Sequence, residues 1–219
     1  MQVIVVDQKR NARDMALIDA MHRLRAKVFA ERLHWRVDCQ HGVEKDRFDD
    51  ARPTYILLVE QDIEVVGCVR LLPPARASML FDVFPQLLDE VPLDLNGQMI
   101  ESSRFCIDRD PTQHVVMPGD ALEARSLVDF RTRFLLAAIL EWCLLNGYEE
   151  LITVTDVRFE RLLRIVGWPL RRLGRPLLID KTESIAGVLA VTRQAFETLK
   201  PGRYRSLMES AAIAKVGSP

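Results

Sequence analysis

The apolar residues of this chain fall into short β-branched runs that alternate with longer stretches of helical spacing. A β-branched run predicts a strand over Met1–Asp7. Apolar residues then recur every three or four positions from Asn11 to about Arg32, which predicts a helix. Two further runs, Tyr55–Glu60 and Glu64–Leu72, predict paired strands around a turn near Gln61. The first third of the chain therefore predicts a strand, a helix and a hairpin.

The rest of the chain continues this alternation. A short helix is expected over Met79–Phe84, a strand over Met99–Asp108, and a long helix from a cap at Asp120 to Leu145. The remaining predicted elements are the strand Leu151–Thr155, the helix Asp156–Val166 ending near Gly167, the strands Leu177–Ile179 and Gly187–Val191, and the helix Arg193–Lys200. Two segments lack such a pattern: about 34–52 is expected to be an irregular, mobile loop, and the tail after about 204 is expected to fray.

Elements in this order predict an α/β fold, a three-layer α/β/α sandwich with a mixed central sheet. The 219 residues, 48% of them hydrophobic, suffice for one sizeable core, so we expect a single domain over 1–219. The order and lengths of the elements suit the scaffold of GNAT-type acyltransferases. That inference concerns the fold alone, because one fold hosts many functions.

Charge and composition narrow the class of protein. The formal net charge of −1 opposes a whole-protein electrostatic grip on nucleic acid or on an anionic membrane. No apolar run is long enough to span a bilayer, and the first residues lack the basic flank of a signal peptide, so we expect a cytoplasmic protein. Neither the four cysteines nor the four histidines have the spacing of metal ligands, so no metal site is predicted.

Several catalytic motifs are missing from the sequence. It contains no Gly-x-Ser-x-Gly, no His-Glu-x-x-His and no phosphate-binding glycine loop. The run Asp108-Arg109-Asp110-Pro111 also lacks the glycine-rich turn with which ordinary GNAT enzymes bind the pyrophosphate of coenzyme A. Coenzyme A is therefore held differently from the GNAT pattern or is not used.

Two stretches carry the candidate chemistry, the charged segment Glu44–Asp49 and the strand Met99–Asp108. Strict alternation puts Ile100, Ser102, Arg104, Cys106 and Asp108 on one face of that strand, and Glu101, Ser103, Phe105 and Ile107 on the other. A carboxylate and a guanidinium in mid-strand need partners of opposite charge, and the sequence offers Asp46, Asp49, Arg70 and Arg25. This predicts a polar cluster facing a cleft. A purely structural ion-pair cluster is the alternative.

Eight residues carry a family resemblance. They are Arg25, Phe29, Trp35, Asp46, Asp49, Arg70, Glu101 and Arg104. They lie in the settings Arg-x-x-x-Phe, Glu-x-Asp-x-Phe-Asp, Gly-x-x-Arg-Leu-x-Pro and Glu-x-Ser-Arg-Phe, with a lone Trp between the first two. In this order they resemble the acyl-homoserine-lactone synthases, or autoinducer synthases, over the N-terminal two thirds of the chain.

The resemblance implies an acyltransferase that uses S-adenosylmethionine and an acyl thioester, usually carried by acyl carrier protein. The amine of S-adenosylmethionine attacks the thioester, and the acylated product then cyclises with loss of methylthioadenosine. S-adenosylmethionine is a substrate here, so no cofactor is expected. Two alternatives stay open from the residues: a GNAT-like enzyme that transfers an acyl group from coenzyme A to another amine, and a non-catalytic binding module. The sequence favours a monomer and does not fix the oligomeric state.

The resemblance also implies roles for single residues. Glu101 is the candidate base for the α-ammonium group, and backbone N–H groups around Ser103–Phe105 or the Arg104 side chain are candidate oxyanion donors. The expected catalytic set is Glu101, Arg104, Ser103, Arg70, Asp46 and Asp49. The expected S-adenosylmethionine contacts are Arg25, Phe29, Trp35, Asp46, Arg104 and Phe105. The acyl-pocket candidates are Met79, Phe105, Ile107, Trp142, Thr153, Thr155 and Leu178.

A basic segment supplies the candidate partner surface. Six arginines and one acid lie between Arg158 and Arg175, and Arg158, Arg161 and Arg164 share one face of the expected helix. Acyl carrier proteins are acidic, so this stripe is the predicted docking surface for one. The alternative is a solvated helix face.

Overall fold

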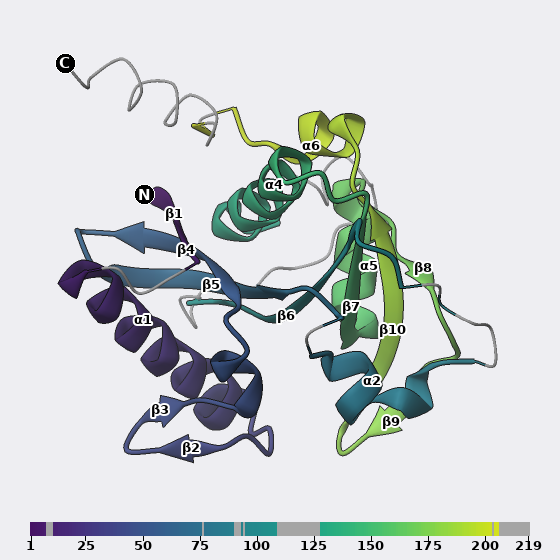
Figure 1. Cartoon of the computed structure of the whole chain (residues 1–219), viewed down its shortest axis with the longest axis horizontal. Coiled ribbons are helices and arrows are strands. Elements are labelled where there is room, and N and C mark those ends of the chain that lie inside the picture. The colour runs from purple at the N-terminus through teal and green to yellow at the C-terminus, as the bar shows by residue number, and fades with distance from the viewer. Residues whose placement is uncertain are drawn as a thin grey trace.

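An eight-stranded mixed sheet forms the centre of the protein (Figure 1). The structure is a computed structural model and describes residues 1–7, 11–75, 77–89, 93, 95–108, 128–202, 204 and 205. The strands follow the order β1-β4-β5-β6-β7-β10-β8, with β9 paired to β10; β6 and β7 are parallel, and the other pairs are antiparallel. The strands are β1 (Gln2–Val6), β4 (Thr54–Glu60), β5 (Glu64–Leu72), β6 (Met99–Ile107), β7 (Glu150–Asp156), β8 (Arg171–Arg172), β9 (Leu177–Ile179) and β10 (Thr182–Ala190).

Helices cover both faces of this sheet, as the predicted three-layer sandwich requires (Figure 1). The helix α1 (Ala12–Arg25) packs on β5 and α2 (Met79–Val83) packs on β7, both on one face. The helices α4 (Phe130–Leu145), α5 (Val157–Val166) and α6 (Arg193–Leu199) lie on the other, where they share the largest buried core cluster. The central mixed sheet with helices on both faces confirms the predicted fold class.

The sheet opens between β6 and β7. These parallel strands pair only from Met99 opposite Glu150 to Ser102 opposite Thr153. Beyond that point β6 stays with β5 as far as Ile107, whereas β7 stays with β10 as far as Asp156. The second halves of the two strands are therefore not bonded to each other.

A β-bulge at Arg104 changes which side chains of β6 share a face. Cys106 pairs with Cys68 and Ser103 pairs with Arg70, so two residues of β6 lie opposite one of β5. Arg104 takes the left-handed conformation, with φ of +55°, as the first residue of such a bulge often does. The strict alternation expected for this strand is therefore wrong beyond Ser103.

Burial along β6 shows the consequence of the bulge. Ile100 and Ile107 are seven residues apart, yet both belong to the core under α4. Cys106 belongs to the core under α1, and Arg104 lies near Met79 on the face that also holds Glu101. Glu101 and Arg104 therefore lie on one face of the sheet, although strict alternation predicted opposite faces.

Several other predicted elements need correction. The segment 26–32 continues α1 as a π-helical turn, η1 (Ala26–Arg32), and 34–52 is not irregular throughout. It contains a short hairpin, β2 (Cys39–Gln40) with β3 (Val43–Glu44), and the 3₁₀ helix η2 (Arg47–Asp50). Another 3₁₀ turn, η3 (Pro85–Leu87), follows α2. The predicted mobility of 34–52 stays a prediction.

The long helix α4 begins nine residues later than predicted, since its cap is Asp129 and not Asp120. Asp129 is its N-cap, and its carboxylate accepts a hydrogen bond from the Arg131 backbone N–H at 3.0 Å. The predicted cap at Asp120 and the turn after Asp108 lie outside the described residues, as does most of the tail after Tyr204. β10 is longer than its predicted Gly187–Val191 core because it extends back to Thr182.

Candidate active site

Arg25 lies at the C-terminal end of α1 and is completely buried. Its Nε donates to the carboxylate of Glu44, and its two terminal nitrogens donate to both oxygens of Asp49 at 2.7 and 3.0 Å. A buried guanidinium requires such pairing, because removing an ion from water costs several kcal/mol. The helix is thereby tied to the loop that carries both acids.

Arg70 on β5 is the second buried guanidinium, 1% exposed. It donates to both carboxylate oxygens of Asp46, and its Nη1 also donates to Asp49 at 2.9 Å. Its Nε donates to the hydroxyl of Ser103 on the neighbouring strand at 3.0 Å, and its Nη2 approaches the sulfur of Met79 at 3.1 Å. The expected pairing of Asp46 and Asp49 with Arg70 is confirmed.

Arg104 on β6 completes the cluster and is less enclosed. Its Nε and Nη2 contact Glu44, each at 3.0 Å, and Nη2 contacts Asp46 at 2.8 Å. In the described part of the chain, the contact recorded for Nη1 is the Met79 sulfur at 3.8 Å. A thioether is a weak acceptor, so this nitrogen keeps hydrogen-bonding capacity for a ligand.

An aromatic pair stands beside the exposed side of Arg104. Its guanidinium carbon lies 5.6 Å from the ring centre of Phe29, within cation–π range. Phe29 is buried and stacks on Trp35, with ring centres 5.1 Å apart and planes 13° apart. Trp35 is 40% exposed. Phe29 and Trp35, two of the residues expected to contact S-adenosylmethionine, therefore lie next to the charge cluster.

Local capping fixes the loop that supplies the acids. Asp46 is the N-cap of η2: its side chain accepts from the Phe48 N–H at 2.9 Å, and Asp49 accepts from the Asp46 N–H at 2.8 Å. This reciprocal pattern is a capping box. The ring of Phe48 is buried at 3% exposure, below the Arg70 guanidinium. The spacing of Asp46, Phe48 and Asp49 therefore points both carboxylates at the arginines.

The electrostatics of the cluster follow from burial and pairing. Burial alone would raise the pKa of Asp49, but hydrogen bonds from Arg25 and the charges of Arg25 and Arg70 hold this pKa well below its usual range. Burial and the Asp49 carboxylate raise the pKa of Tyr55, whose hydroxyl donates to Asp49 at 2.7 Å. Asp49 is therefore ionised and Tyr55 protonated at neutral pH.

Glu101 occupies a separate place on the same face. It is 2% exposed, and its carboxylate accepts from the backbone N–H groups of Met79 at 3.0 Å and Leu80 at 2.8 Å. Burial raises the pKa of Glu101, against hydrogen bonds from Leu80, Ser78 and Met79 that lower it. The carboxyl therefore anchors the first turn of α2 and is more basic than an exposed glutamate.

Sequence reasoning missed three members of the cluster. Glu44 is fully buried and bridges Arg25 and Arg104, although it was noted only as the start of the charged stretch. His22 is buried beside it and donates from Nδ1 to the Glu44 carbonyl at 2.8 Å. Tyr55 is the third. The position of His22 one turn before Arg25 was the available signal, because residues three apart share a helix face.

The acyl-pocket candidates do not form one group. Thr153 and Thr155 alternate on β7 with Ile152 and Val154, which face α2, so both threonines face the α5 side. Thr153 also donates to the Ser102 carbonyl at 3.2 Å. Met79 lies on the opposite face with Glu101. These candidates therefore lie on both faces of the sheet, close to the point where the pairing of β6 and β7 ends.

The other candidates lie elsewhere. Phe105 packs against Phe159 on the α5 side, away from Phe29 and Trp35, so it is not brought to the aromatic pair expected to contact S-adenosylmethionine. Ile107 is a core residue near the end of β6. Trp142 and Leu178 lie apart from the other candidates. Trp142, on α4, stacks on Tyr148, which follows the end of that helix. Leu178, on β9, is 73% exposed.

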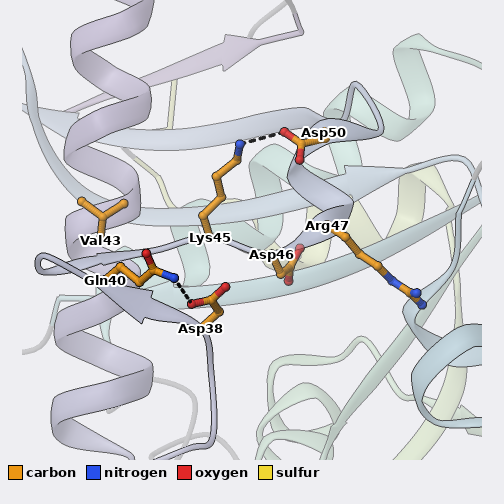
Figure 2. Close-up of a pocket in the computed structure, with 7 residues that line it drawn as sticks. All are labelled: Asp38, Gln40, Val43, Lys45, Asp46, Arg47 and Asp50. Carbon is orange, nitrogen blue, oxygen red and sulfur yellow. Dashed lines mark hydrogen bonds and ion pairs between the residues drawn. The ribbon is translucent and has the colours of Figure 1, made fainter.

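The surface of the acid-bearing loop carries a polar pocket of about 330 Å³ (Figure 2). Its lining residues are Asp38, Gln40, Val43, Lys45, Asp46, Arg47 and Asp50. Figure 2 shows Lys45 turned toward Asp50 and Gln40 toward Asp38, pairs that lie 2.7 and 3.2 Å apart. Asp46 is shared between this pocket and the buried cluster. The pocket therefore lies next to the guanidinium groups.

Of the three arginines predicted to form a docking surface on α5, two are free of recorded ion pairs among the described residues. Arg158 and Arg161 are exposed on α5, and no ion pair is recorded for them in the described ranges. Arg164 lies 3.7 Å from Glu160, whose two oxygens accept hydrogen bonds from Arg172 at 2.7 Å each. Glu160 therefore neutralises part of the basic segment, and Arg158 and Arg161 are its open members.

A metal-binding group and a membrane-spanning helix are both missing from the residues that the structure describes. Within them, no three or more His, Cys, Asp or Glu side chains are grouped so as to hold a metal ion. No helix among them is both long and apolar enough to cross a membrane.

The charge cluster predicts a specific acid sensitivity. Because the pKa of Asp49 is lowered in the folded protein, its stabilising effect is complete above the unfolded-state pKa of about 4 and is lost as the pH falls below it. Asp49→Asn leaves two buried guanidinium groups short of a partner and is expected to cost about 3–5 kcal/mol at neutral pH. Urea unfolding followed by tryptophan emission measures this loss, which should shrink toward about pH 3.

Asp50→Asn is the matched control. Asp50 is 71% exposed and pairs with Lys45, so this change should cost at most about 1 kcal/mol at any pH. Equal losses for the two variants, or a loss for Asp49→Asn that does not depend on pH, would contradict the assigned role of Asp49.

Known proteins resemble this chain in sequence and in fold. A probable acyl-homoserine-lactone synthase from Sinorhizobium fredii is 43% identical over 206 residues, covering 94% of this chain and 95% of that protein. The crystal structure of the AHL synthase LasI superposes with a TM-score of 0.73 at 29% identity, covering 90% of this chain and 94% of that one.

A third similar structure is that of BjaI, a CoA-dependent acyl-homoserine lactone synthase solved with SAM and isopentyl-CoA. It has a TM-score of 0.77 and 24% identity and covers 98% of both chains, a likeness that concerns the fold. Residues 9–199 match the family model described as autoinducer synthase. The chain therefore belongs to the autoinducer synthase family, the acyltransferases that make acyl-homoserine lactones as quorum-sensing signals.

Proposed function

We propose that the cluster around Arg104 binds S-adenosylmethionine and that Glu101 removes the proton from its amine before acyl transfer. The observation that carries the proposal is the free bonding capacity of Arg104 Nη1. Among the residues that the structure describes, the contact recorded for this nitrogen is a thioether, while Nε and Nη2 are held by two carboxylates. The guanidinium is thus fixed in place with one terminus open to an anion.

The α-carboxylate of S-adenosylmethionine fits this open terminus. Arg70 Nη2 approaches the same Met79 sulfur, so two guanidinium groups converge on a side chain that is not an anion. Met79 is flexible and 9% exposed. A small shift of the Met79 side chain lets a carboxylate accept hydrogen bonds from both arginines, and Arg104 supplies most of the binding.

The stacked pair of Phe29 and Trp35 suits the rest of the nucleotide. An exposed indole face stacks with adenine, and aromatic faces attract the sulfonium cation. The pair lies beside Arg104, so both ends of S-adenosylmethionine can be held at once. Arg25 contributes indirectly, because it holds the Glu44 carboxylate that fixes Arg104.

Glu101 then acts on the amine. Its raised pKa makes it a better base than an exposed carboxylate, and it lies on the same face of β6 as Arg104. Deprotonation, directly or through a water between base and amine, gives the neutral amine, which attacks the thioester carbonyl. The carbon–nitrogen bond forms, the thioester carbon–sulfur bond breaks, and the carrier leaves as its thiol. The tetrahedral oxyanion is stabilised by backbone N–H groups near the Arg104 bulge, where β6 is not bonded to β7.

Lactone formation needs little further chemistry from the protein. The sulfonium makes methylthioadenosine a good leaving group, so the carboxylate oxygen attacks the γ-carbon and the carbon–sulfur bond breaks. The site contributes by folding the carboxylate back toward that carbon. Holding the carboxylate at Arg104 and the adenine at Trp35 sets the two ends in that relation.

The acyl donor is proposed to be carried by acyl carrier protein. The N-terminus of α4, which follows β6, is capped by the Asp129 carboxylate, and the Arg131 guanidinium is held by Glu60 and the Asp108 carbonyl. A negative cap at this helix start disfavours a diphosphate there, as coenzyme A would require in the GNAT arrangement. The exposed Arg158 and Arg161 suit an acidic carrier protein.

We also expect that the reaction takes place in the cytoplasm.

The proposed base is tested by Glu101→Gln. The amide keeps one acceptor for the α2 backbone but cannot take a proton, so turnover should fall by about two to four orders of magnitude. Losing one hydrogen bond should cost about 1–3 kcal/mol without preventing folding. Lactone extracted from a host that makes no such signal, followed by kinetics on the purified enzyme, measures the change.

Ser78→Ala is the control for this variant. It removes the α2 N-cap and one hydrogen bond to Glu101, but it leaves the Glu101 carboxylate and its two backbone donors in place. If Ser78→Ala and Glu101→Gln lower turnover by the same factor, Glu101 acts through α2 and not as the base. Turnover close to wild type for Ser78→Ala supports the proposal.

The carrier surface is tested by charge reversal at Arg158 and Arg161. The double Glu variant should raise the Michaelis constant for acyl carrier protein thioesters by about tenfold or more at low salt, and less at high salt. S-adenosylmethionine affinity should not change. Reversal of the exposed Arg193 on α6 is the control. An unchanged Michaelis constant at low salt would instead favour a coenzyme A thioester.

A further inference from the structure

The sulfur of Met79 lies where two guanidinium groups converge. Arg70 Nη2 approaches this sulfur at 3.1 Å, and Arg104 Nη1 approaches it at 3.8 Å. The backbone N–H of Met79 donates to the Glu101 carboxylate at 3.0 Å, so the side chain starts from a fixed point at the beginning of α2. A thioether is a weak acceptor. Two charged donors therefore meet a group that satisfies them poorly.

Oxidation turns such a sulfur into a strong acceptor. A hydroperoxide transfers one oxygen to the thioether: the O–O bond breaks, an S–O bond forms, sulfur loses two electrons, and the peroxide leaves as water or an alcohol. The distance from the Met79 sulfur to Arg104 Nη1, 3.8 Å, is about 1 Å longer than a charge-assisted hydrogen bond. An oxygen bonded to this sulfur therefore comes within hydrogen-bonding reach of Nη1.

Met79 differs in this respect from the other enclosed methionines that the structure describes. Met21 is 0% exposed in the apolar cluster under α1, and Met99 is 4% exposed in the apolar cluster beside α2. A sulfoxide oxygen at either place would be buried among apolar side chains and would lose its hydrogen bonds to water, which is costly. Met79 keeps 9% of its surface exposed, and its oxygen would meet two charged donors.

We propose that Met79 is an oxidation site and that its sulfoxide blocks the binding of S-adenosylmethionine. The inference rests on the proposed function, in which the substrate carboxylate accepts hydrogen bonds from Arg70 and Arg104 after the Met79 side chain shifts. The sulfoxide oxygen uses the same donors and stays attached to the protein. The substrate carboxylate then finds Arg104 Nη1 occupied, so a hydroperoxide lowers lactone synthesis at the substrate-binding step.

Calorimetric titration before and after treatment with hydrogen peroxide tests the inference, with peptide masses to locate each added oxygen. Once Met79 is oxidised, the affinity for S-adenosylmethionine should fall by about tenfold or more, because a hydrogen bond between charged groups is lost. The affinity for the decarboxylated analogue should not change, since it has no carboxylate to place. A Met79 thioether that survives while the exposed Met15 is oxidised would overturn the inference.

Two leucine variants separate this site from the other oxidisable side chains. Met15 is 57% exposed on α1, so Met15→Leu should lose affinity for S-adenosylmethionine on oxidation as the wild type does. Met79→Leu cannot form the sulfoxide, so its affinity after peroxide should equal its own affinity before treatment. An equal loss in the two variants would assign the effect to another residue and refute the role of Met79.

Met79→Gln imitates the sulfoxide without an oxidant, because its amide carbonyl is a strong acceptor at a similar distance from the backbone. This variant should bind S-adenosylmethionine about tenfold more weakly than Met79→Leu, and the two should bind the decarboxylated analogue equally. Melting temperatures verify that both variants fold. Equal affinities of the two folded variants for S-adenosylmethionine would contradict the inference.

The same titrations distinguish failure of the inference from failure of the proposed function. Untreated wild-type protein that binds S-adenosylmethionine no more tightly than the decarboxylated analogue would overturn the proposed function. Untreated protein that prefers S-adenosylmethionine, and keeps this preference in full once Met79 is oxidised, would overturn the inference alone.

Discussion

The structure depends on one constraint, the mutual neutralisation of three arginines and three acids in a largely water-free space. Arg25, Arg70 and Arg104 come from α1, β5 and β6, whereas Glu44, Asp46 and Asp49 come from one loop. An unpaired member would cost several kcal/mol, so none of these elements can move away alone. The cluster therefore fixes the loop against the sheet and holds Arg104 at the mouth of the strand opening. In the proposed function, the contacts that stabilise the fold also position the arginine that binds substrate.

Much of this arrangement follows from sequence pattern. The bounds of β5 at Glu64–Leu72 and of β9 at Leu177–Ile179 were predicted to the residue, because short apolar runs between turn residues mark strands clearly. Pairing of Asp46 and Asp49 with Arg70 was implied by the family resemblance, and it gives these buried charges the partners of opposite charge that they need. Glu44 was missed for a physical reason: its burial depends on Arg25, nineteen residues away, and nothing local distinguishes it from an exposed loop acid.

The bulge at Arg104 is what sequence pattern could not supply. Alternation assumes that each residue lies opposite one residue of the next strand, and the bulge at Arg104 breaks that pattern. A glycine in the sequence would have indicated a positive φ, but here an arginine has a φ of +55°. This single irregularity brings Arg104 to the side of Glu101 and sends Phe105 to the side of Phe159. It thus separates a charged face, which we propose binds the nucleotide substrate, from an apolar face on the α5 side.

Calorimetric titration with S-adenosylmethionine and with its decarboxylated analogue tests the central claim most directly. If the buried acids hold Arg104 so that its free terminus binds the substrate carboxylate, the analogue should bind at least about tenfold more weakly, because a hydrogen bond to a charged group contributes about 1.5–3 kcal/mol. The difference in affinity should be present without any acyl donor. Equal affinities for the two compounds would contradict the account.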